Sequence, residues 1–245
     1  MLLAALFLLA AAPDGAPAKP AQSAQVEVSA KAVALSRLLN PEDKMAALVV
    51  HALDTGFHTA LLADTAEAKV FDQHPGLAEA ILSAARPVIS AHVSKSSPRM
   101  LRRFAGFYAG RFTSDELDTL IAFYSSPTGV KMIEGMYSGV NLSILANKLN
   151  DDPEAKLATS DVSAITRSTV QRIFPVFNDS DKAALLTFAR KPVYPKLQRA
   201  IPAFHKLVAE VANEPDPELD SAMKATVKKA VKEFLAKEGR SASVG

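Results

Sequence analysis

The stretch "FTSDELDTLIAFYSSPTG", residues 112–129, carries the most regular helix signals in this chain of 245 residues. Thr113 and Glu116 are spaced as a capping box, in which the side chain of each residue binds a free backbone N–H group of the other. Apolar residues then recur every three or four positions, as on the buried face of a helix. Ser126 and Pro127 are favoured residues for the cap and the first position of a second helix. The stretch therefore predicts a helical hairpin rather than a catalytic motif.

The same pattern returns 65 residues later, since residues 112–132 align without a gap on "FNDSDKAALLTFARKPVYPKL", residues 177–197. The equivalent pairs include Phe112 and Phe177, Leu120 and Leu185, Phe123 and Phe188, Pro127 and Pro192, and Lys131 and Lys196. We infer a tandem duplication of a three-helix unit, with diverged repeats at residues 97–150 and 162–213. The alternative is that two unrelated hairpins use the same capping chemistry.

The remaining segments after the N-terminal linker also have helical periodicity, and almost none alternates as a strand does. The sequence therefore predicts an all-α protein, a bundle of about nine or ten helices in a single domain over residues 25–245. Pro87 is expected to kink or divide one helix, and Ser97 with Pro98 is expected to start the next. A basic amphipathic helix is expected at residues 217–238.

The opening stretch resembles a bacterial family known as domain of unknown function 2059. The pattern of that family is met here, within residues 102–136, by Phe112, Thr113, Glu116, Leu117, Phe123, Tyr124, Ser126, Pro127, Gly129 and Lys131. The resemblance implies an all-helical, exported bacterial protein, and it implies no activity, cofactor or catalytic residue. The second repeat departs from the pattern at the Tyr and Gly positions.

The N-terminus predicts export. An apolar run spans residues 2–12, which is too short to cross a bilayer but has the length of the hydrophobic region of a signal peptide. We expect a signal peptide and linker at residues 1–24, and a periplasmic or secreted protein. No Lys or Arg precedes the run, which is unusual for a signal, and the alternative is a buried N-terminal helix.

The composition and the motifs of the chain exclude several kinds of catalytic and metal site. The chain has no cysteine, so disulfides, thiolate metal sites and cysteine nucleophiles are excluded. The net charge of +2 does not favour a nucleic-acid partner. His51 and His58 share a helix face but stand about 10 Å apart along it, too far for a metal-ligand pair. There is no nucleophile elbow and no Gly-rich phosphate loop. The sequence therefore predicts no catalytic residue, no cofactor and no metal site.

The function that this pattern favours is a non-enzymatic exported binding or accessory protein with a groove between the repeats. The candidate binding residues are the aromatics Phe107, Tyr108, Tyr124 and Tyr137. The expected partner is an unidentified envelope protein or a small apolar ligand. Two alternatives stay open: an envelope hydrolase that uses carboxylates of the cleft, and a peripheral membrane protein that acts through residues 218–238.

Overall fold

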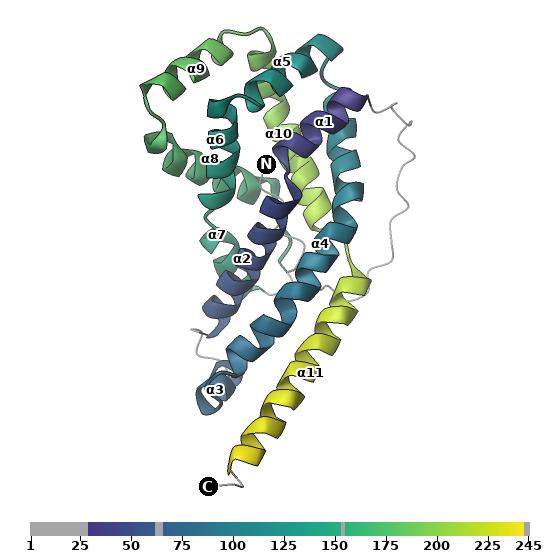
Figure 1. Cartoon of the computed structure of the whole chain (residues 1–245), viewed down its shortest axis with the longest axis vertical. Helices are drawn as coiled ribbons and strands as arrows, with labels where there is room; N and C mark the ends of the chain where they lie inside the picture. The colour runs from purple at the N-terminus through teal and green to yellow at the C-terminus, as the bar shows by residue number, and fades with distance from the viewer. Residues whose placement is uncertain (1–28, 62–65, 153–154, 243–245) are drawn as a thin grey trace.

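The computed structural model describes residues 29–61, 66–152 and 155–242, and these residues form α-helices, one short 3-10 turn and no β-strand (Figure 1). The predicted all-α fold is confirmed. The predicted signal peptide and linker lie outside the described residues. The elements are α1 (Ala30–Leu39), α2 (Glu42–Leu61), α3 (Ala66–Gln73), α4 (Leu77–Ala109), α5 (Ser114–Tyr124), α6 (Pro127–Ser138), α7 (Ser143–Asp151), α8 (Thr159–Ile173), η2 (Phe174–Val176), α9 (Asp179–Ala189), α10 (Val193–Ala212) and α11 (Pro217–Ala242).

The long helix α4 is the axis against which α1, α2 and α11 pack (Figure 1). It runs without a break through Pro87 and Pro98, so the prediction of a new helix starting at Ser97 was wrong. Pro98 has no N–H group to donate to the Ser94 carbonyl, and the Ser97 hydroxyl donates to that carbonyl instead at 3.3 Å. A proline inside a helix costs about 3 kcal/mol. The burial of one face of α4 over its whole length offsets that cost.

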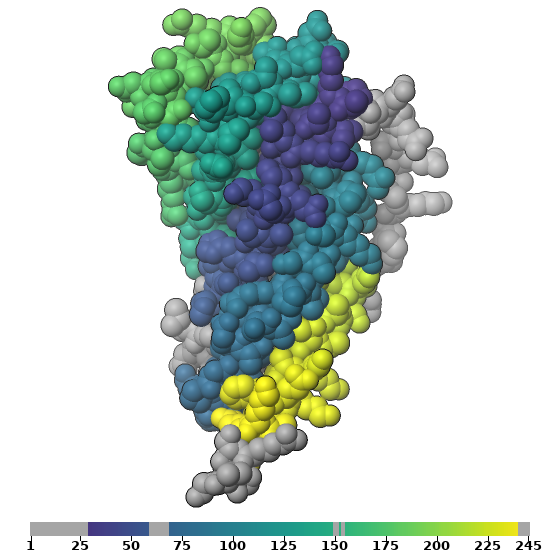
Figure 2. Space-filling model, in the orientation of Figure 1, coloured from purple at the N-terminus to yellow at the C-terminus, as the bar shows by residue number. Residues whose placement is uncertain are grey.

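Helix α11 corresponds to the expected basic amphipathic helix and lies along α4 (Figure 2). Leu219 and Ala230 are buried, and Phe234 packs on a small second core formed with the start of α4. The apolar face of α11 is therefore already covered. The lysines of its other face are exposed to solvent.

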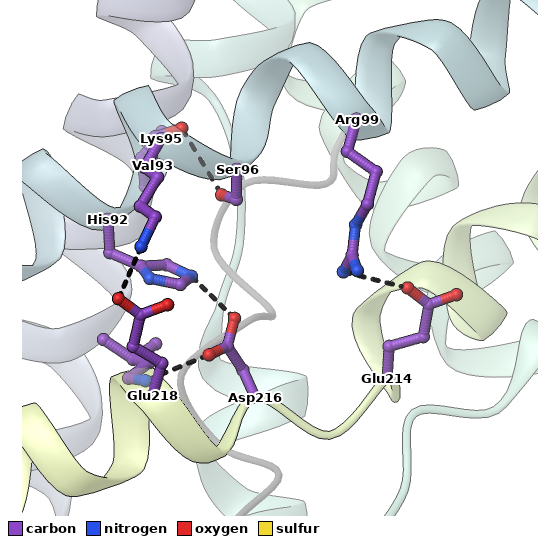
Figure 3. A network of polar contacts seen from close by, with 9 residues as sticks. His92, Val93, Lys95, Ser96, Arg99, Glu214, Asp216 and Glu218 are labelled. Atoms are coloured by element: carbon purple, nitrogen blue, oxygen red, sulfur yellow. Dashed lines mark hydrogen bonds and ion pairs between the residues drawn. The ribbon is translucent and has the colours of Figure 1, made fainter. Parts of the chain in front are cut away.

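The start of α11 and the turn before it are also held to α4 by polar contacts (Figure 3). Their acidic side chains lie opposite basic side chains of α4 at 2.9 Å for Asp216 and His92, 2.5 Å for Glu218 and Lys95, and 3.3 Å for Glu214 and Arg99. These contacts and the buried apolar face fix the direction in which α11 leaves the body. No helix in the described part of the chain is both long and apolar enough to cross a bilayer.

The two predicted hairpins, α5 with α6 and α9 with α10, begin in the same way. In α5 the Thr113 hydroxyl accepts from the Glu116 N–H group, and the Glu116 carboxylate accepts from the Thr113 N–H group. In α9 Asn178 and Asp181 make the same reciprocal pair of hydrogen bonds. The capping box predicted at Thr113 and Glu116 is thus formed, and the second hairpin has one as well.

The two hairpins also contact each other reciprocally. Lys131 of α6 donates to Asp181 at 2.6 Å, and its equivalent Lys196 of α10 donates to Glu116 at 2.6 Å. Each lysine thus binds the capping-box carboxylate of the other hairpin. Such an exchange, in which residue i contacts j and the equivalent of j contacts the equivalent of i, is the property of a two-fold symmetric interface.

Aromatic contacts follow the same rule. The equivalent residues Phe123 and Phe188 stack on each other, with ring centroids 3.8 Å apart and ring planes 6° apart. A residue that meets its own equivalent lies on the local symmetry axis. This approximate two-fold arrangement places the inner faces of the two hairpins opposite each other.

Candidate ligand-binding cavity

A cavity of about 720 Å³ lies between the two units, within the size range of small-molecule sites. One side is formed by α1, α4, α5 and α6, and the other by α8, η2, α9 and α10. Its walls consist almost entirely of aromatic and aliphatic side chains. Among the lining residues there is no Asp or Glu, and the polar ones besides tyrosine are Thr166, Lys182, Gln198 and His205.

Phe204 of α10 is the central aromatic residue of the wall. Its ring centroid lies 5.1 Å from that of Phe107 and 5.7 Å from that of Tyr108, both on α4. On the other side Phe188 of α9 lies 5.7 Å from Tyr194 of α10. Such edge-on and offset contacts hold large rings in fixed orientations. The wall is therefore built by helices from both units.

Of the four aromatic residues predicted from the sequence, the structure brings three to the cavity. Phe107, Tyr108 and Tyr124 line it. Tyr137 does not, because it points to α1, where its hydroxyl donates to the Leu39 carbonyl at 3.3 Å. Phe204 was not among the residues predicted from the sequence, although it lies on the apolar face of α10.

Two tyrosine hydroxyls of the lining make no hydrogen bond to a described residue. Tyr108 and Tyr124 are 4% and 5% exposed. Burial, together with the neighbouring Tyr124 and Tyr137, raises the pKa of Tyr108. Burial and the nearby Tyr194 raise the pKa of Tyr124 to about 12. Both hydroxyls are therefore protonated at neutral pH and can donate a hydrogen bond to a molecule in the cavity.

His205, at the edge of the cavity, contacts Ser163 in a way that does not activate the serine. The Nδ1 atom of His205 lies 2.9 Å from the Ser163 hydroxyl, which also lies 2.9 Å from the Thr159 carbonyl. The carbonyl can only accept, and a hydroxyl has a single proton. Both contacts are satisfied together when Ser163 donates to Thr159 and His205 donates to Ser163. Burial lowers the pKa of His205, so the neutral imidazole orients the α8–α10 contact.

The acidic residues nearest to the hairpin contact are already paired. The ion pairs with Lys196 and Lys131 lower the pKa of Glu116 and of Asp181 respectively. These carboxylates are therefore ionised and bound to lysine, and neither lines the cavity. Within residues 29–61, 66–152 and 155–242, no group of three or more His, Asp or Glu side chains is arranged to hold a metal ion.

Comparison with known protein families gives a match that covers the first hairpin. No curated protein and no solved structure matches the chain. Residues 98–141, from the last part of α4 to the end of the first hairpin, match the family described as "Uncharacterized protein conserved in bacteria (DUF2059)". The matched segment includes Phe107, Tyr108 and Tyr124 of the cavity wall. The resemblance read from the motif is therefore confirmed, and residues 98–141 of this chain carry the pattern of domain of unknown function 2059.

Proposed function

We propose that this chain is an exported, non-enzymatic protein that binds a largely apolar small molecule in the cavity between its two helical units. The observation that carries the proposal is the cavity of about 720 Å³ with apolar walls and no acidic lining residue. Apolar pockets with a few polar groups are typical binding sites. A carboxylate hydrolase would need two converging acids, and none lines this cavity.

The hydroxyls of Tyr108 and Tyr124 indicate which polar group the ligand carries. A protonated tyrosine hydroxyl is a hydrogen-bond donor, so an oxygen acceptor on the ligand pairs with it. Tyr108 and Tyr124 come from different helices, α4 and α5, yet both line the cavity. The ligand that fits is an apolar molecule with a carbonyl, carboxyl or ether oxygen.

The export part of the proposal rests on the sequence. The apolar run at residues 2–12 has the length of a signal-peptide core, and the related family is bacterial. An apolar ligand has low solubility in water, and a cavity with apolar walls would carry it between the places where it is made and used.

Native mass spectrometry of the protein, expressed with its own N-terminus and purified gently from the periplasm, tests both parts. We expect a processed chain that carries an additional mass of a few hundred daltons, the scale of a cavity-sized ligand. An unprocessed chain in the cytoplasm would overturn the export proposal. A processed chain that is always free of ligand, even after incubation with a membrane lipid extract, would overturn the binding proposal.

Matched tyrosine variants locate the ligand. Tyr108→Phe and Tyr124→Phe each remove one hydroxyl from the cavity, so each should lower ligand affinity about 3- to 10-fold, the effect of one hydrogen bond. Tyr137→Phe is the control, because that hydroxyl binds Leu39 and lies outside the cavity lining. Equal effects of all three substitutions would contradict the assignment.

A further inference from the structure

The exposed apolar side chains of this protein gather at the opening of the cavity. In the part of the chain that the structure describes, eight large apolar residues are exposed, and five of them lie in or beside the second unit. These five are Val170 of α8, Phe174 and Val176 of η2, Leu186 of α9 and Ile201 of α10. All except Val176 also line the cavity, so they mark its rim. We name these five residues the rim.

The rim differs from an ordinary protein surface, on which exposed apolar residues occur singly. Phe174, Val176 and Leu186 are 54%, 65% and 62% exposed. Single exposed apolar residues are common, but a group around a cavity opening indicates a surface that contacts something apolar.

The charge around the rim indicates what that surface contacts. Residues 162–205 contain seven Lys or Arg and two Asp or Glu. The two acids are already paired, Asp181 with Lys131 and Asp179 with Lys182. The exposed cations of this segment that make no ion pair with a described residue are Arg167, Arg172, Arg190, Lys191 and Arg199.

Two of these cations lie on the same helix faces as the rim. Arg167 precedes Val170 by three residues in α8, and Arg190 follows Leu186 by four at the end of α9. Residues three or four apart share one face of a helix. Apolar side chains with cations on the same helix faces are complementary to a bilayer with an anionic surface, where apolar groups enter the acyl boundary and cations meet the phosphates.

We propose that the rim is a docking surface for an anionic lipid bilayer, through which the cavity exchanges its ligand. The exchange rests on the proposed function, whereas docking itself does not. The surface differs from α11, the segment that the sequence suggested for membrane contact. The apolar face of α11 packs on α4, and α11 runs along the opposite side of the molecule from α8 and α9 (Figure 1).

Sedimentation with vesicles tests the proposal. The full chain should bind vesicles of phosphatidylglycerol and phosphatidylcholine, bind pure phosphatidylcholine much more weakly, and lose affinity as salt is added. Val176→Asp should abolish binding. Val130→Asp on α6 is its control, because Val130 is also exposed, at 41%, but lies outside the cavity lining. Loss of binding in both variants, or no binding by the unmodified chain, would overturn the proposal in favour of a protein partner.

Charge variants separate the rim from α11. Arg167→Gln and Arg190→Gln should each weaken binding about five-fold. Lys224→Gln and Lys228→Gln, on the exposed face of α11, should leave binding unchanged. The reverse result would assign docking to α11 and overturn the proposal.

A separate readout distinguishes docking from ligand binding. Val176 does not line the cavity, so Val176→Asp should keep the ligand mass in native mass spectrometry while it loses vesicle binding. Rim-dependent vesicle binding by a chain that never carries a ligand would leave docking intact and overturn ligand exchange.

Discussion

The two helical units share one pattern of helix signals, yet they treat their apolar residues differently. In the first unit Met136 is 1% exposed, whereas the equivalent Ile201 of the second unit is 41% exposed. Ala105 is fully buried, whereas its equivalent Val170 is 41% exposed. The second unit therefore buries the apolar side chains at these equivalent positions less.

The difference follows from what packs on each unit. Helix α1 lies against both α4 and α5 and covers the first unit, whereas the main contacts of α9 are with α6 and α10. Equivalent apolar positions are therefore buried in the first unit and form part of the exposed rim of the cavity in the second. Helix capping thus fixes where each helix begins. The neighbouring helices determine whether the apolar face of that helix is buried in the core or is exposed and able to bind a ligand.

The largest expected effect comes from truncating equivalent side chains in the two units. Met136→Ala should lower the free energy of unfolding by at least about 2 kcal/mol, because it removes buried methylene groups and leaves a void. Ile201→Ala should cost less than about 1 kcal/mol, since the side chain is partly in water already. Urea unfolding monitored by circular dichroism gives both values, and equal costs would remove the contrast between the units.

A glycine that the second unit lacks provides the next test. A Cβ atom on Gly129 would lie 2.2 Å from the Phe123 carbonyl oxygen and 2.5 Å from the Tyr124 Cα atom. Gly129→Ala should therefore lower the free energy of unfolding by about 1–3 kcal/mol, as overpacking does.

The control for this substitution is Gly106→Ala in α4, where a Cβ atom would have nothing within 4 Å. Gly106→Ala should stabilise the protein slightly, because alanine is the better helix former. The second unit has Tyr194 at the position of Gly129, and its α10 begins without a side-chain cap, so its turn does not need the close approach. A tolerated alanine at position 129 would contradict this explanation.

The smallest effect concerns the reciprocal ion pairs that join the units. The pKa of Glu116 is lowered chiefly by the hydrogen bond from Lys196. Below the ordinary pKa of glutamate, the unfolded chain therefore binds more protons than the folded one, so the stability from this pair is complete at neutral pH and is lost as the pH falls through the lowered pKa. The loss should be at most about 1 kcal/mol, because the pair is partly exposed.

Urea unfolding at neutral pH and at successively lower pH values measures this loss. Glu116→Gln should flatten the pH dependence in the acidic range, and Lys196→Met should flatten it to the same extent. If Lys196→Met left the acid dependence of stability unchanged, the pairing of Glu116 with Lys196 would not be its source.

Much of the fold follows from residues close together in the sequence. Thr113 with Glu116 and Asn178 with Asp181 are each three positions apart, so the hydrogen bonds that start α5 and α9 need nothing beyond the local chain. The lysines equivalent in the two repeats were visible in the sequence as well. What the alignment did not show is that each lysine binds the carboxylate of the other hairpin.

Predictions made from neighbouring residues failed where packing against distant parts of the chain had the larger effect. Pro87 predicts a kink or a division, and Ser97 with Pro98 predicts a new helix, but α4 continues through both prolines because its neighbours bury one face of the helix. The residues of the candidate site could not be identified from the local sequence either. Tyr108, Tyr124 and Tyr137 all lie on buried helix faces, but only the first two line the cavity.

The all-α class and the caps of both hairpins can be read from the sequence alone, as can the likeness between the hairpins, because these features depend on contacts within about one helical turn. Three features depend on the packing of the whole molecule. Two equivalent phenylalanines meet at the axis between the hairpins, Phe204 forms the centre of the cavity wall, and the rim is exposed. Those features depend on which helices of different units pack together. Hydrophobic burial, which drives that packing, is non-directional, so a periodic pattern shows which face is apolar but not what covers it.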